Sequence, residues 1–159
     1  MSTDEPAPVE AVERGMVRLR RSMSRQGLGR AAIREHNLPV DLRILHVTDA
    51  IDEGPDQPGQ EMSVGLVASR LGIDPSRGSR IVAEAVKEGY VRRVASQEDG
   101  RRIQLELTEA GRKVVESARR TRLRRFEQAM SDWTEHERRE FARLLGRFVE
   151  HRDEDDERR

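Results

Sequence analysis

Two arginines, a serine and a glycine stand together near the start of a helix that we predict over residues 74–88. Arg77 and Arg80 each carry a planar guanidinium that matches the O6 and N7 acceptors of guanine, and Ser79 can bond a phosphate or a base edge. In a helix-turn-helix, the first turns of the second helix point into the DNA major groove. Gly78 is a poor helix former, which indicates close approach of the backbone to a neighbour. The simpler alternative is a solvent-facing arginine pair on a buried helix.

A second group of charges lies in a polar turn further along the chain. Asp99 and Gly100 precede Arg101 and Arg102. An arginine inserted in a narrow minor groove gains from the negative potential there, and an aspartate two residues earlier can bond and orient its guanidinium. An incidental ion pair in an ordinary turn is the alternative. The turn is more informative in its context, because a hairpin directly after a helix-turn-helix describes a winged helix.

Local patterns predict the elements that position these charges. Ser63 is a candidate N-cap for a short helix, and Asp74–Pro75 begins the next helix, which ends at Gly89. Residues 90–94 predict a strand. Residues 103–107 alternate apolar and polar side chains, so they predict a second strand with one buried face. The central part of the chain is therefore a helix-turn-helix followed by a β-hairpin.

Both ends of the chain predict helices whose apolar stripes have no partner nearby in sequence. A first helix from Val9 ends near Gly27 and Gly29, and a second helix begins at Leu38–Pro39. Thr108 caps a helix of about 23 residues, with a length of about 35 Å. The two stripes most simply meet in one intertwined helical dimer. They consist of Val9, Val12, Met16, Leu19 and Met23 at the start and of Phe141, Leu144, Leu145, Phe148 and Val149 at the end.

Composition limits the classes of function. Of the 159 residues, 35% are hydrophobic and 38% are charged, which is little core material for a lone globule and favours pairing with another chain. The 30 basic and 30 acidic residues cancel, yet residues 14–34 and 112–125 are strongly basic, so local fields are strong. The absence of cysteine excludes disulfides, thiolate nucleophiles and cysteine-ligated zinc. No apolar run reaches the roughly 20 residues of a membrane span, and the acidic N-terminus is unlike a signal peptide, so we expect a cytoplasmic protein.

The residues of known enzyme motifs are missing. His36, His46, His136 and His151 share no metal-ligand spacing, and His136–Glu140 lacks the second histidine of a zinc-protease helix. The chain has no G-x-S-x-G string and no Gly-rich phosphate loop. We therefore predict no enzymatic activity, no metal and no cofactor. The remaining alternative to DNA binding is a helical dimeric adaptor protein.

Four short strings occur in order along the chain. They are SRIV at 79–82, KEGYVRR at 87–93, EDGRR at 98–102 and LTEAG at 107–111. This ordered set resembles the MarR-type multiple antibiotic resistance regulators, and the helical pattern over 9–150 is consistent with that family. The resemblance implies a mainly α fold with a small β-hairpin wing, in which a winged helix-turn-helix is joined to an N- and C-terminal helical dimerisation domain.

The resemblance also implies a function and roles for individual residues. It implies a homodimeric repressor that binds a pseudo-palindromic operator in double-stranded DNA and is often released by a small ligand. It implies that residues 74–80 start the recognition helix, and that Arg101 enters the minor groove with Asp99 orienting it. The family's cysteine-based oxidation sensing is excluded here. The expected DNA-binding residues are Ser63, Asp74, Ser76, Arg77, Gly78, Ser79, Arg80, Arg93, Asp99, Arg101 and Arg102.

A small-molecule site is a separate hypothesis. A pocket between the dimer helices and the winged helix would suit an anionic, aromatic carboxylate, and ordinary interface roles for the same residues are the alternative. The candidate ligand-binding residues are Arg14, Arg18, His36 and His46. The expected organisation is a disordered tail at 1–8, a helical dimerisation domain at 9–36 and 109–152, a winged helix-turn-helix at 38–108 and a charged tail at 153–159.

Overall fold

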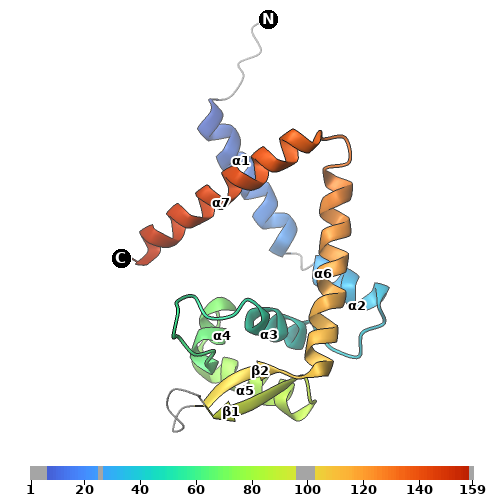
Figure 1. Ribbon diagram of the computed structural model, residues 1–159, viewed down its shortest axis with the longest axis vertical. Helices are drawn as coiled ribbons and strands as arrows, with labels where there is room; N and C mark the ends of the chain where they lie inside the picture. Colours follow the sequence, from blue (N-terminus) through green and yellow to red (C-terminus); the bar gives the residue numbers. More distant parts are fainter. Residues whose placement is uncertain (1–6, 25–26, 96–102, 158–159) are drawn as a thin grey trace, which may run out of the picture. The chain divides into compact units, whose positions relative to one another are not determined.

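The computed structural model describes residues 7–24, 27–95 and 103–157. Within them the backbone forms seven helices and one antiparallel pair of strands, which confirms the predicted mainly α fold with a hairpin (Figure 1). The chain divides into two compact units, Met1–Arg122 and Leu123–Arg159. None of the described helices has the length and apolar character needed to cross a bilayer. The elements are α1 (Pro8–Ser24), α2 (Gly27–Glu35), α3 (Leu42–Asp52), α4 (Val64–Arg70), α5 (Pro75–Lys87), β1 (Val91–Ala95), β2 (Ile103–Leu107), α6 (Glu109–Ala129) and α7 (Glu135–Glu157).

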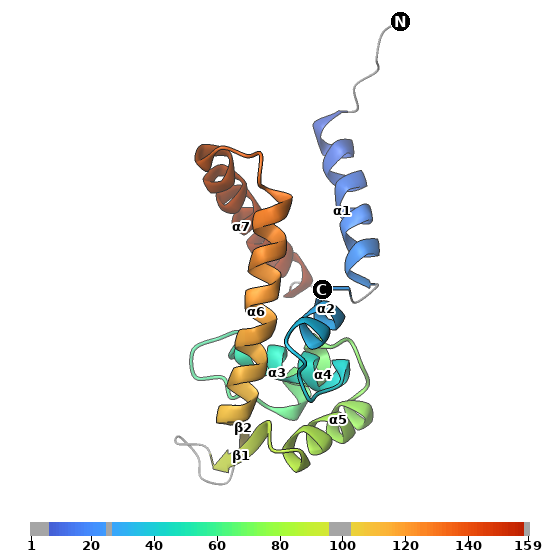
Figure 2. The same cartoon turned by 90° about the vertical axis from the view of Figure 1, so that its right-hand side faces the viewer.

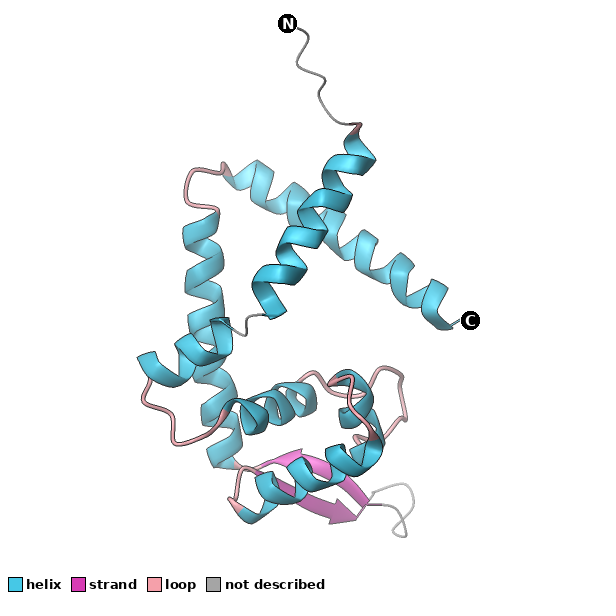
Figure 3. Ribbon diagram, turned by 180° about the vertical axis from the view of Figure 1, so that it is seen from behind, coloured by secondary structure: helices cyan, strands magenta, loops and turns pink. Residues whose placement is uncertain are grey.

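The winged helix consists of α3, α4, α5 and the β1–β2 hairpin, which lie together in the first unit (Figures 1 and 3). In the hairpin Val91 is opposite Leu107, and Ala95 is opposite Ile103. The alternation along β2 buries Leu105 and Leu107, as a strand with one buried face requires, while Ile103 stays exposed. The core that the hairpin joins contains Ile44, Leu45, Val47, Val67 and Val82, all with almost no exposed surface.

Side-chain caps begin both helices of the helix-turn-helix at the predicted positions. Ser63 Oγ accepts a hydrogen bond from the Leu66 N–H at 3.1 Å. An Asp74 carboxylate oxygen accepts from the Arg77 N–H at 2.9 Å, and Pro75 is the first residue of α5. Each cap satisfies a backbone donor that the helix itself leaves unpaired, so the two starts follow from local chemistry.

The start of α3 differs from the prediction. The sequence pattern placed a helix start at Leu38–Pro39, but α3 begins at Leu42. Its cap is Asp41, which accepts from the N–H groups of Arg43 at 2.8 Å and Ile44 at 3.0 Å. An aspartate with two backbone donors outweighs the general preference of proline for a first helical turn.

The region before α3 contains a helix that the sequence pattern did not predict. The predicted first helix ran to Gly27 and Gly29, whereas α1 ends at Ser24 and α2 starts at Gly27. At Gly29 the two helices α2 and α3 approach closely, because a Cβ there would lie 2.5 Å from Leu42 Cδ1. Gly29 therefore serves a helix–helix contact, which the sequence pattern does not distinguish from a helix end.

α6 begins directly after the hairpin, and its first turn packs on the chain that precedes β1 (Figure 2). Thr108 donates from its N–H to the Tyr90 carbonyl at 3.0 Å and from its hydroxyl to the Gly89 carbonyl at 2.6 Å. Gly89 has a φ of +83°, a left-handed conformation that glycine adopts without steric cost. A Cβ at Gly111 would collide with the Tyr90 carbonyl oxygen. These contacts fix the base of the hairpin against α6.

The second unit holds the end of α6 and all of α7. Thr134 and Glu137 cap α7 reciprocally: Glu137 Oε2 accepts from the Thr134 N–H at 2.7 Å, and Thr134 Oγ1 accepts from the Glu137 N–H at 3.2 Å. The hydrogen bonds from Thr134 lower the pKa of the Glu137 carboxyl. α7 continues to Glu157 and so includes the first residues of the charged stretch at 153–159.

Candidate nucleic-acid interface

α5 buries one side and exposes the other. Ile81, Val82 and Ala85 face the core and have at most 7% of their surface exposed. The polar side chains in the first two turns are on the opposite side. Ser76, Arg77, Ser79 and Arg80 are all exposed there. The arrangement gives the recognition-helix candidate a solvent-facing surface that is polar and basic.

The two arginines of this surface are not neutralised. Within the described residues neither Arg77 nor Arg80 has an ion-pair partner. The nearest acid in sequence is Asp74, whose carboxylate is engaged with the Arg77 backbone N–H as the helix cap. The start of α5 also carries the positive end of the helix dipole. This surface is therefore suited to an anionic partner such as a phosphate backbone.

Gly78 does not belong to the exposed surface. It is buried, and a Cβ at this position would lie 2.6 Å from the Ala68 Cβ of α4. The sequence indicated that the backbone at Gly78 approaches a neighbour closely. That neighbour is α4, the other helix of the helix-turn-helix. The prediction that Gly78 lies among the DNA-contacting residues is corrected to this packing role.

Ser63 and Arg93 lie at other places on the winged helix. Ser63 is half-buried, with its hydroxyl engaged as the cap of α4. Arg93 is exposed on β1, opposite Leu105. Its neighbour Arg92 pairs with Glu106 across the hairpin at 2.7 Å. A phosphate would therefore have to compete with Glu106 for Arg92.

Asp99, Arg101 and Arg102 lie outside the described residues. They fall in the connection between β1 and β2, whose last described pair is Ala95 with Ile103. Their predicted part in minor-groove binding stays a prediction.

An arginine that the sequence pattern did not single out connects α3 with α5. Arg43 donates to Asp41 Oδ2 from Nη2 at 2.5 Å and to Glu84 Oε1 of α5 at 3.3 Å. Burial opposes ionisation of Asp41, but hydrogen bonds from Ile44 and Arg43 outweigh it and lower the pKa of this carboxyl. The only sequence signal was the aspartate two residues before the arginine, and nothing local pointed to Glu84, 41 residues away.

Comparisons with known proteins show what this part of the chain is similar to. Residues 39–102 match the sequence model described as the MarR family. The matched residues include α3, α4, α5 and β1, so it is the winged-helix part of the chain that is similar to the MarR family. No curated protein matches it significantly.

Several solved structures share the fold at low sequence identity. A MarR family protein from Bacillus stearothermophilus is 16% identical, with a TM-score of 0.71 and coverage of 94% of this chain and 99% of that one. RV1404 from Mycobacterium tuberculosis is 19% identical, with a TM-score of 0.64 and coverage of 94% and 97%. MepR from S. aureus, solved bound to ethidium bromide, is 16% identical, with a TM-score of 0.59 and coverage of 85% and 94%.

The candidate ligand residues are dispersed over the MarR-type fold. Arg14 pairs with Glu10 on α1, and Arg18 is exposed on the same helix. His36 Nε2 lies 3.1 Å from Thr121 Oγ1. His46 alone lines a surface hollow, which it shares with Arg30, Asp41, Leu42 and Arg43. The described residues contain no group of three or more histidines and acids placed to hold a metal ion.

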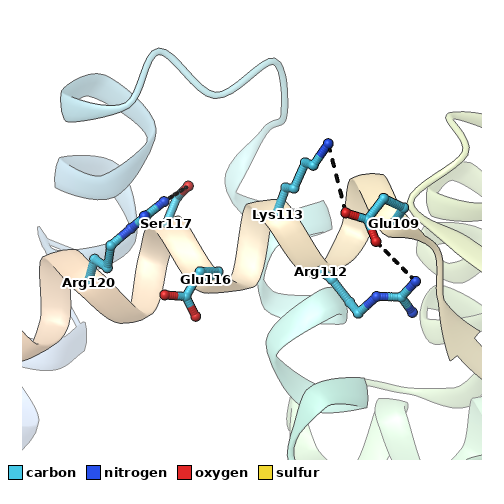
Figure 4. A pocket seen from close by; sticks show the side chains of 6 residues that line it. All are labelled: Glu109, Arg112, Lys113, Glu116, Ser117 and Arg120. Atoms are coloured by element: carbon cyan, nitrogen blue, oxygen red, sulfur yellow. Dashed lines mark hydrogen bonds and ion pairs between the residues drawn. The ribbon is translucent and has the colours of Figure 1, made fainter.

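A second hollow follows the first turns of α6 after the MarR-type wing (Figure 4). Its cations are largely engaged within the helix: Glu109 lies 3.3 Å from Arg112 and 3.8 Å from Lys113. Arg120 Nη2 donates to Ser117 at 3.4 Å. The basic run predicted at 112–125 is therefore partly neutralised at this surface.

Proposed function

We propose that this protein is a sequence-specific DNA-binding regulator of transcription that acts as a repressor. The observation that carries the proposal is the pair of exposed, unneutralised arginines, Arg77 and Arg80, in the first turns of α5 on a MarR-type winged helix. In helix-turn-helix proteins this part of the second helix contacts base edges in the major groove. Arg101, with Asp99 to orient it, has the proposed role in the adjacent minor groove.

The proposal extends to a homodimer on a pseudo-palindromic operator. The apolar residues of α7 are 39–48% exposed, and Val12 of the α1 stripe is 51% exposed. The α7 residues are Phe141, Leu144, Leu145, Phe148 and Val149. An exposed apolar face along a helix is typical of a protein interface. A second copy that covers it would hold two recognition helices about one DNA turn, roughly 34 Å, apart.

We expect the protein to be a dimer in the absence of DNA. Burial of the apolar face of α7 against a second copy provides the free energy, and salt should affect it little because the contact is apolar. Light scattering at micromolar concentration measures the mass directly. A monomeric mass would contradict the proposed dimer.

We expect the affinity for duplex DNA to fall steeply and log-linearly with salt, because contacts between arginines and phosphates release counterions. Selection of bound sequences from a random DNA pool, followed by titration at several salt concentrations, provides the test. A two-fold symmetric selected site supports the dimer. A flat salt dependence, or no binding to any duplex, favours the adaptor protein that binds no DNA.

We further propose that a small anionic aromatic ligand releases the DNA. The supporting observation is the hollow in which His46 lies beside Arg30 and Arg43, where a carboxylate would meet Arg30 and compete with Asp41 for Arg43. Arg43 also contacts Glu84 of α5. A ligand that draws Arg43 away from Glu84 would therefore remove a contact between α3 and the recognition helix. We expect aromatic carboxylates to raise the melting temperature and lower DNA affinity. Absence of both effects across a carboxylate panel would contradict this part of the proposal.

A further inference from the structure

A partly buried ion pair joins α6 to α3. Arg122 Nη1 donates to Asp49 Oδ2 at 2.8 Å, and the side chains are 33% and 24% exposed. The second carboxylate oxygen, Asp49 Oδ1, is buried and has no hydrogen-bond partner among the described residues. A buried carboxylate stabilises a fold only when its remaining lone pairs are also satisfied. This pair does not meet that condition.

The charges around Asp49 do not compensate for its burial. Burial raises the pKa of the Asp49 carboxyl, the attraction of Arg122 and His46 only reduces the increase, and Asp52 adds repulsion. A folded-state pKa above the unfolded value means that the stability from this group is present at low pH and lost as the pH rises through the folded pKa. The ionised form of Asp49 is therefore less favourable for the fold than its protonated form.

The pair occupies the place where the burial of α6 ends. Its neighbour Thr121 is fully buried, donates to Glu35 Oε2 of α2 at 3.2 Å and lies 3.1 Å from His36 Nε2. Leu123, the next residue after Arg122, is 50% exposed. Polar contacts from α2, α3 and α6 thus meet at two consecutive positions of α6, at the end of the first unit.

The polar contacts at Thr121 and Arg122 restrict how α6 can slide or rotate, which apolar packing does not. Hydrogen bonds from Thr108 hold the start of α6 to the hairpin, whereas Val114, Val115 and Ala118 bury its middle turns by apolar contact, which is non-directional. A slip of one residue moves a helix by about 1.5 Å along its axis and turns it by about 100°. An arginine–carboxylate hydrogen bond disfavours both changes, because it is directional and geometrically specific.

We propose that Asp49 and Arg122 are positioning residues whose ion pair fixes the register of the later turns of α6 on the winged helix at the expense of stability. In a dimer joined through the terminal helices, that register sets the separation of the two α5 helices. The proposal rests on the dimeric DNA-binding function proposed above. It predicts that neutralising Asp49 leaves the fold at least as stable but broadens the range of distances between the two α5 helices.

The chain has no cysteine, so a single Lys87→Cys substitution on the exposed end of α5 admits one nitroxide label per protomer. Electron–electron dipolar spectroscopy of the labelled dimer then measures the separation of the two α5 helices. We expect a narrow distance distribution in the labelled parent and a broader one after Asp49→Asn, with a melting temperature that is unchanged or raised. Asp56→Asn is the matched control, because it removes the carboxylate charge from the 2.6 Å contact with Arg70 in the same unit and should leave the distribution narrow.

Arg122→Met gives a second, independent variant. It leaves the Asp49 carboxylate buried without its cation, so we expect a lower melting temperature together with a broad distribution. An equally narrow distribution in Asp49→Asn overturns the proposal, as does a melting temperature lowered as much as in Arg122→Met. A monomer without a dipolar signal overturns both this proposal and the dimer. Failure of the wild-type protein to bind DNA rejects the proposed function and leaves the distance result unaffected.

Discussion

Replacing Gly111 by alanine should destabilise the protein by about 3 kcal/mol, at the upper end of the cost of overpacking a well-packed site. The added Cβ would meet the carbonyl oxygen of Tyr90, which is backbone and is itself held by the Thr108 N–H at 3.0 Å. Neither partner can move without disturbing the base of the hairpin. Chemical denaturation, read as the free energy of unfolding, provides the measurement.

The control for Gly111 is the same substitution at Gly65 in α4. A Cβ there has only an ordinary contact, with Ser63 Oγ at 3.7 Å. Gly65→Ala should stabilise the protein by about 0.5–1 kcal/mol, because alanine loses less backbone entropy in a helix than glycine. Equal effects of the two substitutions would show that close approach at Gly111 is unimportant.

Removing both arginines from the start of α5 should abolish specific DNA binding. Each contact of an arginine with a guanine edge is worth about 1–3 kcal/mol, so Arg77→Ala with Arg80→Ala should weaken operator affinity about a hundredfold or more. Both side chains are exposed and lack ion-pair partners among the described residues, so stability should change little. Gel-shift titration with a selected operator measures the affinity, and thermal melting checks the fold.

Lys87→Ala is the matched control for the arginine pair. Lys87 is an exposed cation on the same helix, but it lies in the last turn, away from the end that reads base edges. We expect its loss to reduce affinity weakly and equally for all sequences, as for a phosphate contact. A double arginine variant that binds no worse than Lys87→Ala would remove the start of α5 from the interface.

Features of the chain that depend on neighbouring residues follow from the sequence. The caps at Ser63 and Asp74 need only a side-chain oxygen and an N–H three residues later. The buried face of β2 needs only the alternation of residues 103–107. The glycine turn at Gly89 follows equally from its own conformational freedom. Each of these involves few atoms, so a pattern of residues fixes the outcome.

Features that depend on partners far along the chain required the tertiary structure. The sequence signal at Gly78 is the same whether the backbone there approaches DNA or Ala68. Only the packing of α4 on α5 shows that Ala68 is the neighbour. Thr121 meets His36 across 85 residues, and Arg122 meets Asp49 across 73. A charge in a sequence has many acceptable partners, and the choice among them is made by the apolar core that brings helices together. The sequence therefore determined the winged-helix elements and their exposed arginines, whereas packing alone decided which polar side chains meet.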